Sequence, residues 1–130
     1  MTTELIILGW TLVLAMVQIG LAAIMRTLET GIGYNVGARD AAAPPMRPAT
    51  ARLQRAQANL FETLPLFAAA VLIAHVAGRN GAETLLGCQL FLAGRVLYVP
   101  LYAFGVPVVR TIAFGVSVAG LVMIIKAILA

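Results

Sequence analysis

Four polar side chains enter an otherwise apolar part of this 130-residue sequence. They are Arg52, Arg55, Asn59 and Glu62, in the stretch RLQRAQANLFETLPLF. At about 100° per residue in a helix, they share a face about 80° wide. A charge near the centre of a bilayer costs about 2.5 to 3.5 kcal/mol, so such groups usually have partners and face the bundle interior or a water-filled cavity. The stretch therefore predicts one polar face on a membrane helix.

A purely structural explanation of this face is also open. Arg52 and Arg55 are close enough to the membrane surface for their side chains to reach the headgroups, and Glu62 could pair with a neighbouring arginine. That explanation does not account for an amide and a carboxylate on the same face. Pro65, less than one turn beyond Glu62, frees a backbone carbonyl, and we expect a bend there that could form the wall of a cavity.

A second polar group lies later, in LLGCQLFLAGRVLYVPLYAFG. Arg95, Tyr98 and Tyr102 are spaced i, i+3 and i+7, so they also share a helix face. A cation that stays charged and two phenol hydroxyls suit an anionic ligand or a thiolate, although tyrosines are also common at the membrane interface. Arg110 follows Pro107 in GVPVVRT. Its side chain could extend to the surface or turn inward over the same site.

Other catalytic chemistry has little support in this sequence. His75 is the only histidine, and by helical spacing it projects away from the first polar face. Cys88 is the only cysteine, so no intramolecular disulfide or cysteine metal cluster can form, and we interpret it as a packing residue. We find no metal-ligand cluster, no Ser/His/Asp set and no phosphate-binding glycine loop. We expect no bound metal and no nucleic-acid partner.

The elements that must position these groups are membrane helices. Hydrophobic residues make up 62% of the chain and charged residues 11%, far from the roughly one-quarter charged residues of a soluble domain. The apolar segments are each near or above the roughly 20 residues that cross a bilayer. We therefore predict an all-α membrane protein, a four-transmembrane-helix bundle in a single domain, residues 1–130, with Thr50 as a candidate N-cap of the second helix. The expected helices cover residues of about 4–26, 51–78, 83–104 and 106–129.

The basic residues predict an orientation. Five arginines, from Arg26 to Arg55, lie in or beside the first connection, whereas the second connection has only Arg79. By the positive-inside rule the first connection is cytoplasmic and both termini are outside. The first connection is rich in Gly, Ala and Pro, so we expect no continuous helix there. The other two connections are short and should make the last three helices antiparallel neighbours.

Two stretches resemble a known family. RLQRAQANLFETLPLF resembles the R-A-x-x-N-x-x-E segment and following proline that open the second helix in the MAPEG family, the membrane-associated proteins of eicosanoid and glutathione metabolism. AGRVLYVPLYAFG, with its R-x-x-Y-x-x-x-Y spacing, resembles the family's third-helix motif. The four expected helices and the length agree with the same family. The resemblance covers nearly the whole chain, with two motifs in the right order.

The resemblance implies a homotrimer of four-helix bundles that holds glutathione at the subunit interfaces near the cytoplasmic side. Arg55, Asn59 and Glu62 would hold the glutathione backbone and termini. The third-helix group would contribute from a subunit across the interface, and Arg110 is the candidate for stabilising the thiolate. With Arg52 from the same stripe included, the glutathione-binding set expected from this resemblance is Arg52, Arg55, Asn59, Glu62, Arg95, Tyr98 and Tyr102.

Three functional hypotheses follow. The first is a membrane-bound glutathione transferase or peroxidase that activates the thiolate for attack on lipophilic electrophiles or hydroperoxides, with membrane lipids as neighbours. The second is a non-catalytic lipid-binding or scaffold member of the family, since the spacing of Arg110 from Tyr102 does not quite reproduce the family pattern. The third is a small proton-coupled multidrug transporter, against which stand the arginines around Glu62.

Overall fold

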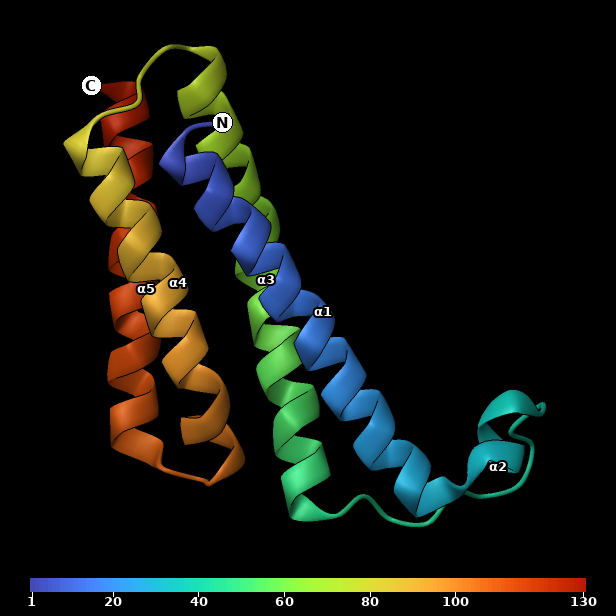
Figure 1. The fold of residues 1–130 in the computed structure, drawn as a ribbon. Coiled ribbons are helices and arrows are strands. Elements are labelled where there is room, and N and C mark those ends of the chain that lie inside the picture. Colours follow the sequence, from blue (N-terminus) through green and yellow to red (C-terminus); the bar gives the residue numbers. More distant parts are fainter.

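The computed structural model describes all 130 residues and consists of helices without a strand. Four of the helices are long and apolar enough to cross a membrane. They confirm the all-α, four-helix fold class and fit an integral multi-pass membrane protein. The helices, labelled in Figure 1, are α1 (Thr3–Thr30), α2 (Ile32–Val36), α3 (Pro48–Val76), α4 (Ala82–Ala103) and α5 (Pro107–Leu129).

Helices α4 and α5 form the tightest pair of the bundle, and α3 packs against both of them. Helix α1 lies on α3 and α4 near the chain termini, and it diverges from α4 and α5 toward the end that carries α2 (Figure 1). Both chain termini are at the opposite end (Figure 1). The first half of α3 and the second half of α4 therefore lie together in the half of the bundle away from the termini.

Two short turns make α3, α4 and α5 antiparallel neighbours, as the sequence predicts. Helix α3 ends before Gly78 and α4 before Gly105, with φ values of 68° and 71° that only glycine adopts without strain. The following amides, of Arg79 and Val106, donate to the carbonyls of Ala74 and Leu101 at 2.8 and 2.9 Å. These bonds satisfy carbonyls that a helix end leaves open. The turn after α4 lies beside the start of α3.

The first connection contains only the short helix α2, which confirms that it is not one continuous helix. Helix α1 runs to Thr30, four residues beyond its expected end near residue 26. The prediction that Thr50 is an N-cap is wrong, because α3 starts at Pro48 with Arg47 as N-cap. Proline tolerates the first helical position since its missing N–H would have no partner there. Thr50 is instead buried within the first turn.

Small residues bring α4 and α5 together. The backbones at Gly87 and Gly120 are so close that a Cβ on Gly87 would lie 2.6 Å from the Gly120 carbonyl oxygen. Small residues at a helix contact allow the van der Waals packing that holds membrane helices together. Helix α3 adds to this pair through Phe67, whose ring stacks on Phe91 of α4 with centroids 4.0 Å apart. Cys88 is buried in the same core, as expected for a packing residue.

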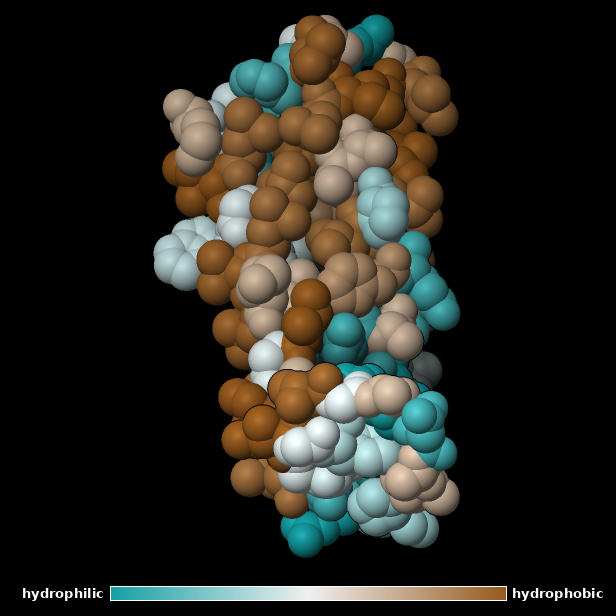
Figure 2. Space-filling model, turned by 90° about the vertical axis from the view of Figure 1, so that its right-hand side faces the viewer, coloured by the Kyte–Doolittle hydropathy of each residue, from teal (hydrophilic) through white to brown (hydrophobic).

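The outer surface is mostly apolar. Large exposed side chains such as Trp10, Leu66, Ile73 and Val122 point away from the bundle. Figure 2 shows the face that carries α1 and α2, with hydrophobic side chains over most of its length and hydrophilic ones gathered at the α2 end. Such a surface suits lipid contact along the helices and polar contact at one membrane interface.

Candidate functional site

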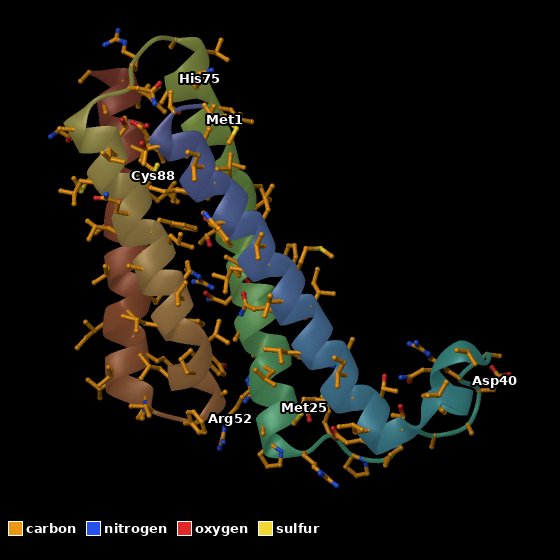
Figure 3. The ribbon with its side chains drawn as sticks, viewed as in Figure 1. Met1, Met25, Asp40, Arg52, His75 and Cys88 are labelled. Carbon is orange, nitrogen blue, oxygen red and sulfur yellow. The ribbon has the colours of Figure 1, made fainter.

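Arg52, Arg55 and Asn59 on the polar face of α3 are directed toward α4 and the turn before α5. Arg52 lies at the beginning of α3 beside this turn (Figure 3). Its guanidinium carbon is so close that a Cβ on Gly105 would lie 3.2 Å from it. Arg52 thus covers the end of the α4–α5 pair, and the next polar residues of α3 follow it into the bundle.

Arg95 connects the polar face of α3 with that of α4, about midway along both. Its side chain is only 1% exposed, and Nη1 donates a hydrogen bond of 2.7 Å to Oδ1 of Asn59. The guanidinium carbon lies 4.6 Å from the centroid of the Tyr98 ring and 5.8 Å from that of Phe114. Aromatic faces attract a cation, most strongly where water is excluded. The sequence analysis did not identify Phe114, since a single phenylalanine in an apolar helix resembles any packing residue.

Tyr102 connects the same two polar faces closer to the end of the bundle that is away from the termini. Nε of Arg55 donates a hydrogen bond of 2.9 Å to its hydroxyl. Arg110 of α5 lies over the same ring, with its guanidinium carbon 4.5 Å from the centroid. Of the two directions that the sequence allows for Arg110, the structure shows the inward one. Within one chain, α3 and α5 thus each place a cation beside one phenol of α4.

Two donors of Arg95 have no partner. Nε and Nη2 are buried and form no hydrogen bond within the chain. A buried donor without an acceptor is unfavourable by about 1 to 3 kcal/mol, and by more in a charged group, so a ligand that accepts these hydrogen bonds would be stabilised. Arg95 is therefore the strongest indication in the structure that the site receives an anionic or carbonyl-bearing ligand.

Glu62 is exposed and forms no ion pair. The ion pairs within the chain join Arg26 to Glu29 and Lys126 to Glu83. The structural explanation of Glu62, pairing with a neighbouring arginine, is therefore not found in this chain. A carboxylate on the outside of a membrane helix is costly next to lipid. Glu62 is available to a ligand or to a second polypeptide.

The two polar groups predicted from the sequence meet within a single chain. Their arrangement across a subunit interface, which the family resemblance implies, stays a prediction. His75 is exposed near the chain termini and takes no part in the site (Figure 3). No group of three or more His, Cys, Asp or Glu side chains could hold a metal ion.

A polar cavity lies on another side of α3 and is lined by residues of α1, α2 and α3. Gln54 and Gln57 line it together with Arg26. The two glutamines were not among the predicted site residues, although their i, i+3 spacing, outside the face that carries Arg55, is a signal in the sequence. Helix α3 thus presents polar side chains both to α4 and to this cavity near one end of the bundle.

Comparison with known proteins identifies one family. The model of the MAPEG family matches residues 7–130, nearly the whole chain. No curated protein matches the chain.

Proposed function

The chain belongs to the MAPEG family, and on this premise we propose that it is a membrane-bound glutathione transferase or peroxidase. It activates the glutathione thiolate for attack on lipophilic electrophiles or hydroperoxides. The observation that carries this proposal is Arg95, buried with two unpaired donors and hydrogen-bonded to Asn59 at 2.7 Å. A site built around such a cation stabilises an anionic ligand within the membrane.

The charges of the site complement those of glutathione. This tripeptide carries two carboxylates and one ammonium group, and its thiol becomes a further anion on activation. Arg52, Arg55 and Arg95 supply cations for the carboxylates, and Glu62 supplies an acceptor for the ammonium group. Tyr98 and Asn59 add neutral hydrogen-bonding groups. This mixture of signs supports binding of a zwitterionic peptide rather than of a simple anion.

Arg110 is the residue that we propose for thiolate stabilisation. It lies at the outer side of the site, over the Tyr102 ring at 4.5 Å. A nearby cation lowers the pKa of a thiol, and arginine keeps its charge at any working pH. The Tyr102 hydroxyl is held by Arg55 at 2.9 Å, so the ring that supports Arg110 is itself fixed. Glutathione supplies the nucleophile, and the chain's residues orient it and hold its negative charge.

We propose that the protein works as a homotrimer. Glu62 and Arg55 are exposed on the outer side of the bundle, where lipid alone would be an unfavourable neighbour. A second copy that covers them would complete the glutathione site and exclude water from it. The second substrate, an apolar electrophile, would reach the site from the bilayer. By the positive-inside rule the site is near the cytoplasmic side.

Thiolate absorbance tests the enzymatic proposal. The purified protein in detergent is titrated with glutathione, and the ultraviolet absorbance of the thiolate is followed for wild type, Arg110→Gln and Arg79→Gln. Arg79 is the matched control, because it is an arginine at the other end of the bundle. Loss of a neighbouring cation raises the pKa of a bound thiol by about one to three units. We expect Arg110→Gln to lose most of the thiolate signal and Arg79→Gln to keep it.

Glutathione binding is measured on the same samples by calorimetry. Binding without thiolate in the wild type would assign the chain to the non-catalytic members and refute the enzymatic proposal. Absence of both binding and thiolate would refute the glutathione site as a whole. An equal loss of thiolate in the two variants would show that Arg110 has no special position.

A further inference from the structure

A carboxylate of α1 lies at the start of α3. Oε1 of Glu29 accepts a hydrogen bond of 2.8 Å from the backbone amide of Arg47, which is the N-cap residue of α3. The side chain of Glu29 is only 6% exposed. The two residues are 18 positions apart in the sequence, so this contact joins the end of α1 to the start of α3 across the whole first connection.

Helix α3 has no side-chain cap of its own. The Arg47 side chain forms no capping hydrogen bond, Pro48 occupies the first turn, and no acidic residue is present there. The first amides of a helix lack partners within it, and the helix dipole gives this end a partial positive charge. The carboxylate of Glu29 satisfies one of these amides and complements the charge. Glu29 therefore replaces, from another helix, the N-cap side chain that α3 lacks.

Arg26 and Glu29 together hold the segment that leads into α3. Nη2 of Arg26 donates to the Pro44 carbonyl at 2.8 Å, three residues before the amide that Glu29 accepts from. Nη1 of Arg26 also lies 3.4 Å from the Glu29 carboxylate, because residues three apart on a helix are neighbours. In Figure 1 the connection passes the end of α1 before α3 begins. One polar pair of α1 thus fixes both a carbonyl and an amide of this segment.

The start of α3 carries the first two arginines of the candidate site. Arg52 and Arg55 lie within about 12 Å of helix from Arg47. Arg52 is so close to the turn after α4 that a Cβ on Gly105 would lie 3.2 Å from its guanidinium carbon, and Nε of Arg55 donates to the Tyr102 hydroxyl at 2.9 Å. A first turn that frays or shifts would move both guanidinium groups relative to α4.

On the basis of the function proposed above, we infer that Glu29 is a positioning residue of the glutathione site. It caps α3 from the end of α1 and so holds Arg52 and Arg55 where they bind the carboxylates of glutathione. Without the cap, glutathione binds only the fraction of molecules in which the start of α3 is ordered, and its apparent affinity falls by that fraction. Once glutathione is bound, Arg110 of α5 acts on the thiol as before.

Two measurements on the full-length protein in detergent test this inference. Hydrogen exchange without ligand reports the opening of residues 48–55, and calorimetry reports the affinity for glutathione. The variants are Glu29→Ala, Glu29→Gln and Glu83→Ala. Glu83 is the matched control, because it is an acidic residue that pairs with Lys126 at 2.9 Å at the other end of the bundle. Loss of an N-terminal cap costs about 1 kcal/mol, which is about fivefold in an equilibrium constant.

We expect Glu29→Ala to exchange residues 48–55 about fivefold faster and to bind glutathione about fivefold more weakly. Its thiolate absorbance at saturating glutathione should equal that of the wild type. Glu29→Gln keeps an oxygen that can accept from the Arg47 amide, so we expect changes of only about twofold. Glu83→Ala should change neither quantity. If Glu29→Ala does not fold, Glu29→Asp takes its place, because the shorter side chain weakens the same bond.

Four results would overturn the inference. Unchanged exchange of residues 48–55 in Glu29→Ala would refute the cap. Faster exchange with an affinity equal to that of Glu83→Ala would refute the positioning role. A lower thiolate signal at saturation would place the effect of Glu29 at the thiol. An equal loss in Glu29→Gln and Glu29→Ala would exclude the hydrogen bond as the cause. If the wild type itself does not bind glutathione, the proposed function fails and the positioning role with it, whereas hydrogen exchange still decides on the cap.

Discussion

Replacement of Gly94 by alanine tests the link between the close packing of α4 and α5 and the geometry of the site. A Cβ at this position would lie 2.6 Å from the carbonyl oxygen of Ala113 and 2.9 Å from the amide nitrogen of Ser117. Ordinary contact begins at 3.4 Å, so the two helices would have to separate by about 0.8 Å. Both neighbours are backbone atoms of α5, which cannot rotate away as a side chain can.

The magnitude follows from a matched variant. Gly115 also lies within α5, and a Cβ there would meet nothing within 4 Å. Alanine in place of glycine favours a helix by about 1 kcal/mol at either position. Overpacking at Gly94 opposes this gain by about 1 to 3 kcal/mol. We therefore expect Gly94→Ala to be less stable than Gly115→Ala by about 1 to 3 kcal/mol. Residual helix in the unfolded state reduces the gain in helix propensity equally in Gly94→Ala and Gly115→Ala. The difference in stability between the two variants is therefore unchanged.

The assay is thermal unfolding in detergent, combined with the thiolate measurement on the same samples. Gly94 precedes Arg95, and a separation of α4 from α5 moves Arg110 away from the Tyr102 ring. We expect Gly94→Ala to lower both the unfolding temperature and the thiolate signal, whereas Gly115→Ala lowers neither. Equal unfolding temperatures for the two variants would refute the close packing. A lower stability with a full thiolate signal would refute its connection to the site.

Two further substitutions test the hydrogen bonds of single hydroxyl groups. Tyr102→Phe removes the acceptor of the 2.9 Å hydrogen bond from Arg55 and keeps the ring. We therefore expect the glutathione affinity, measured by calorimetry, to fall about tenfold. Tyr34→Phe on α2 is the control and should leave the affinity unchanged. Thr84→Val removes the 3.0 Å bond to the buried carboxylate of Glu4 and the 2.8 Å bond that the hydroxyl accepts from the Gly81 amide, and we expect at least about 1.5 to 3 kcal/mol lower stability in thermal unfolding. Thr84→Ser keeps the hydroxyl and should restore the stability, and its failure to do so would exclude the hydrogen bond as the cause.

Much of the fold follows from local sequence patterns. Long apolar segments predict the four membrane helices, because each must satisfy its own backbone hydrogen bonds in lipid. The glycines after α3 and α4 mark the turns that the structure has. The sequence predicts a start of α3 near residue 51 with Thr50 as N-cap, but the helix starts at Pro48, because proline is tolerated at the first helical position. Element boundaries depend on such small differences in free energy.

The candidate site was predictable in part. Helical spacing groups Arg55 with Asn59, and Arg95 with Tyr102, because residues three, four or seven apart share a face. The same spacing could not show which arginine meets which acceptor. It also could not show that Glu62 lacks an ion pair or that Arg95 keeps two free donors. Those properties depend on distances between helices that are far apart in the sequence.

The sequence by itself determined the membrane class, the two polar faces and the family motifs, since periodicity and composition act within one helix. Only the tertiary structure decided the direction of Arg110, whose alternatives at the membrane surface and over Tyr102 differ by contacts from another helix. It also decided that the glutamines of α3 face a cavity that α1 and α2 help to line. The physical reason is the same in both cases. A side chain's partners are chosen by how helices pack, and packing is a property of several segments together.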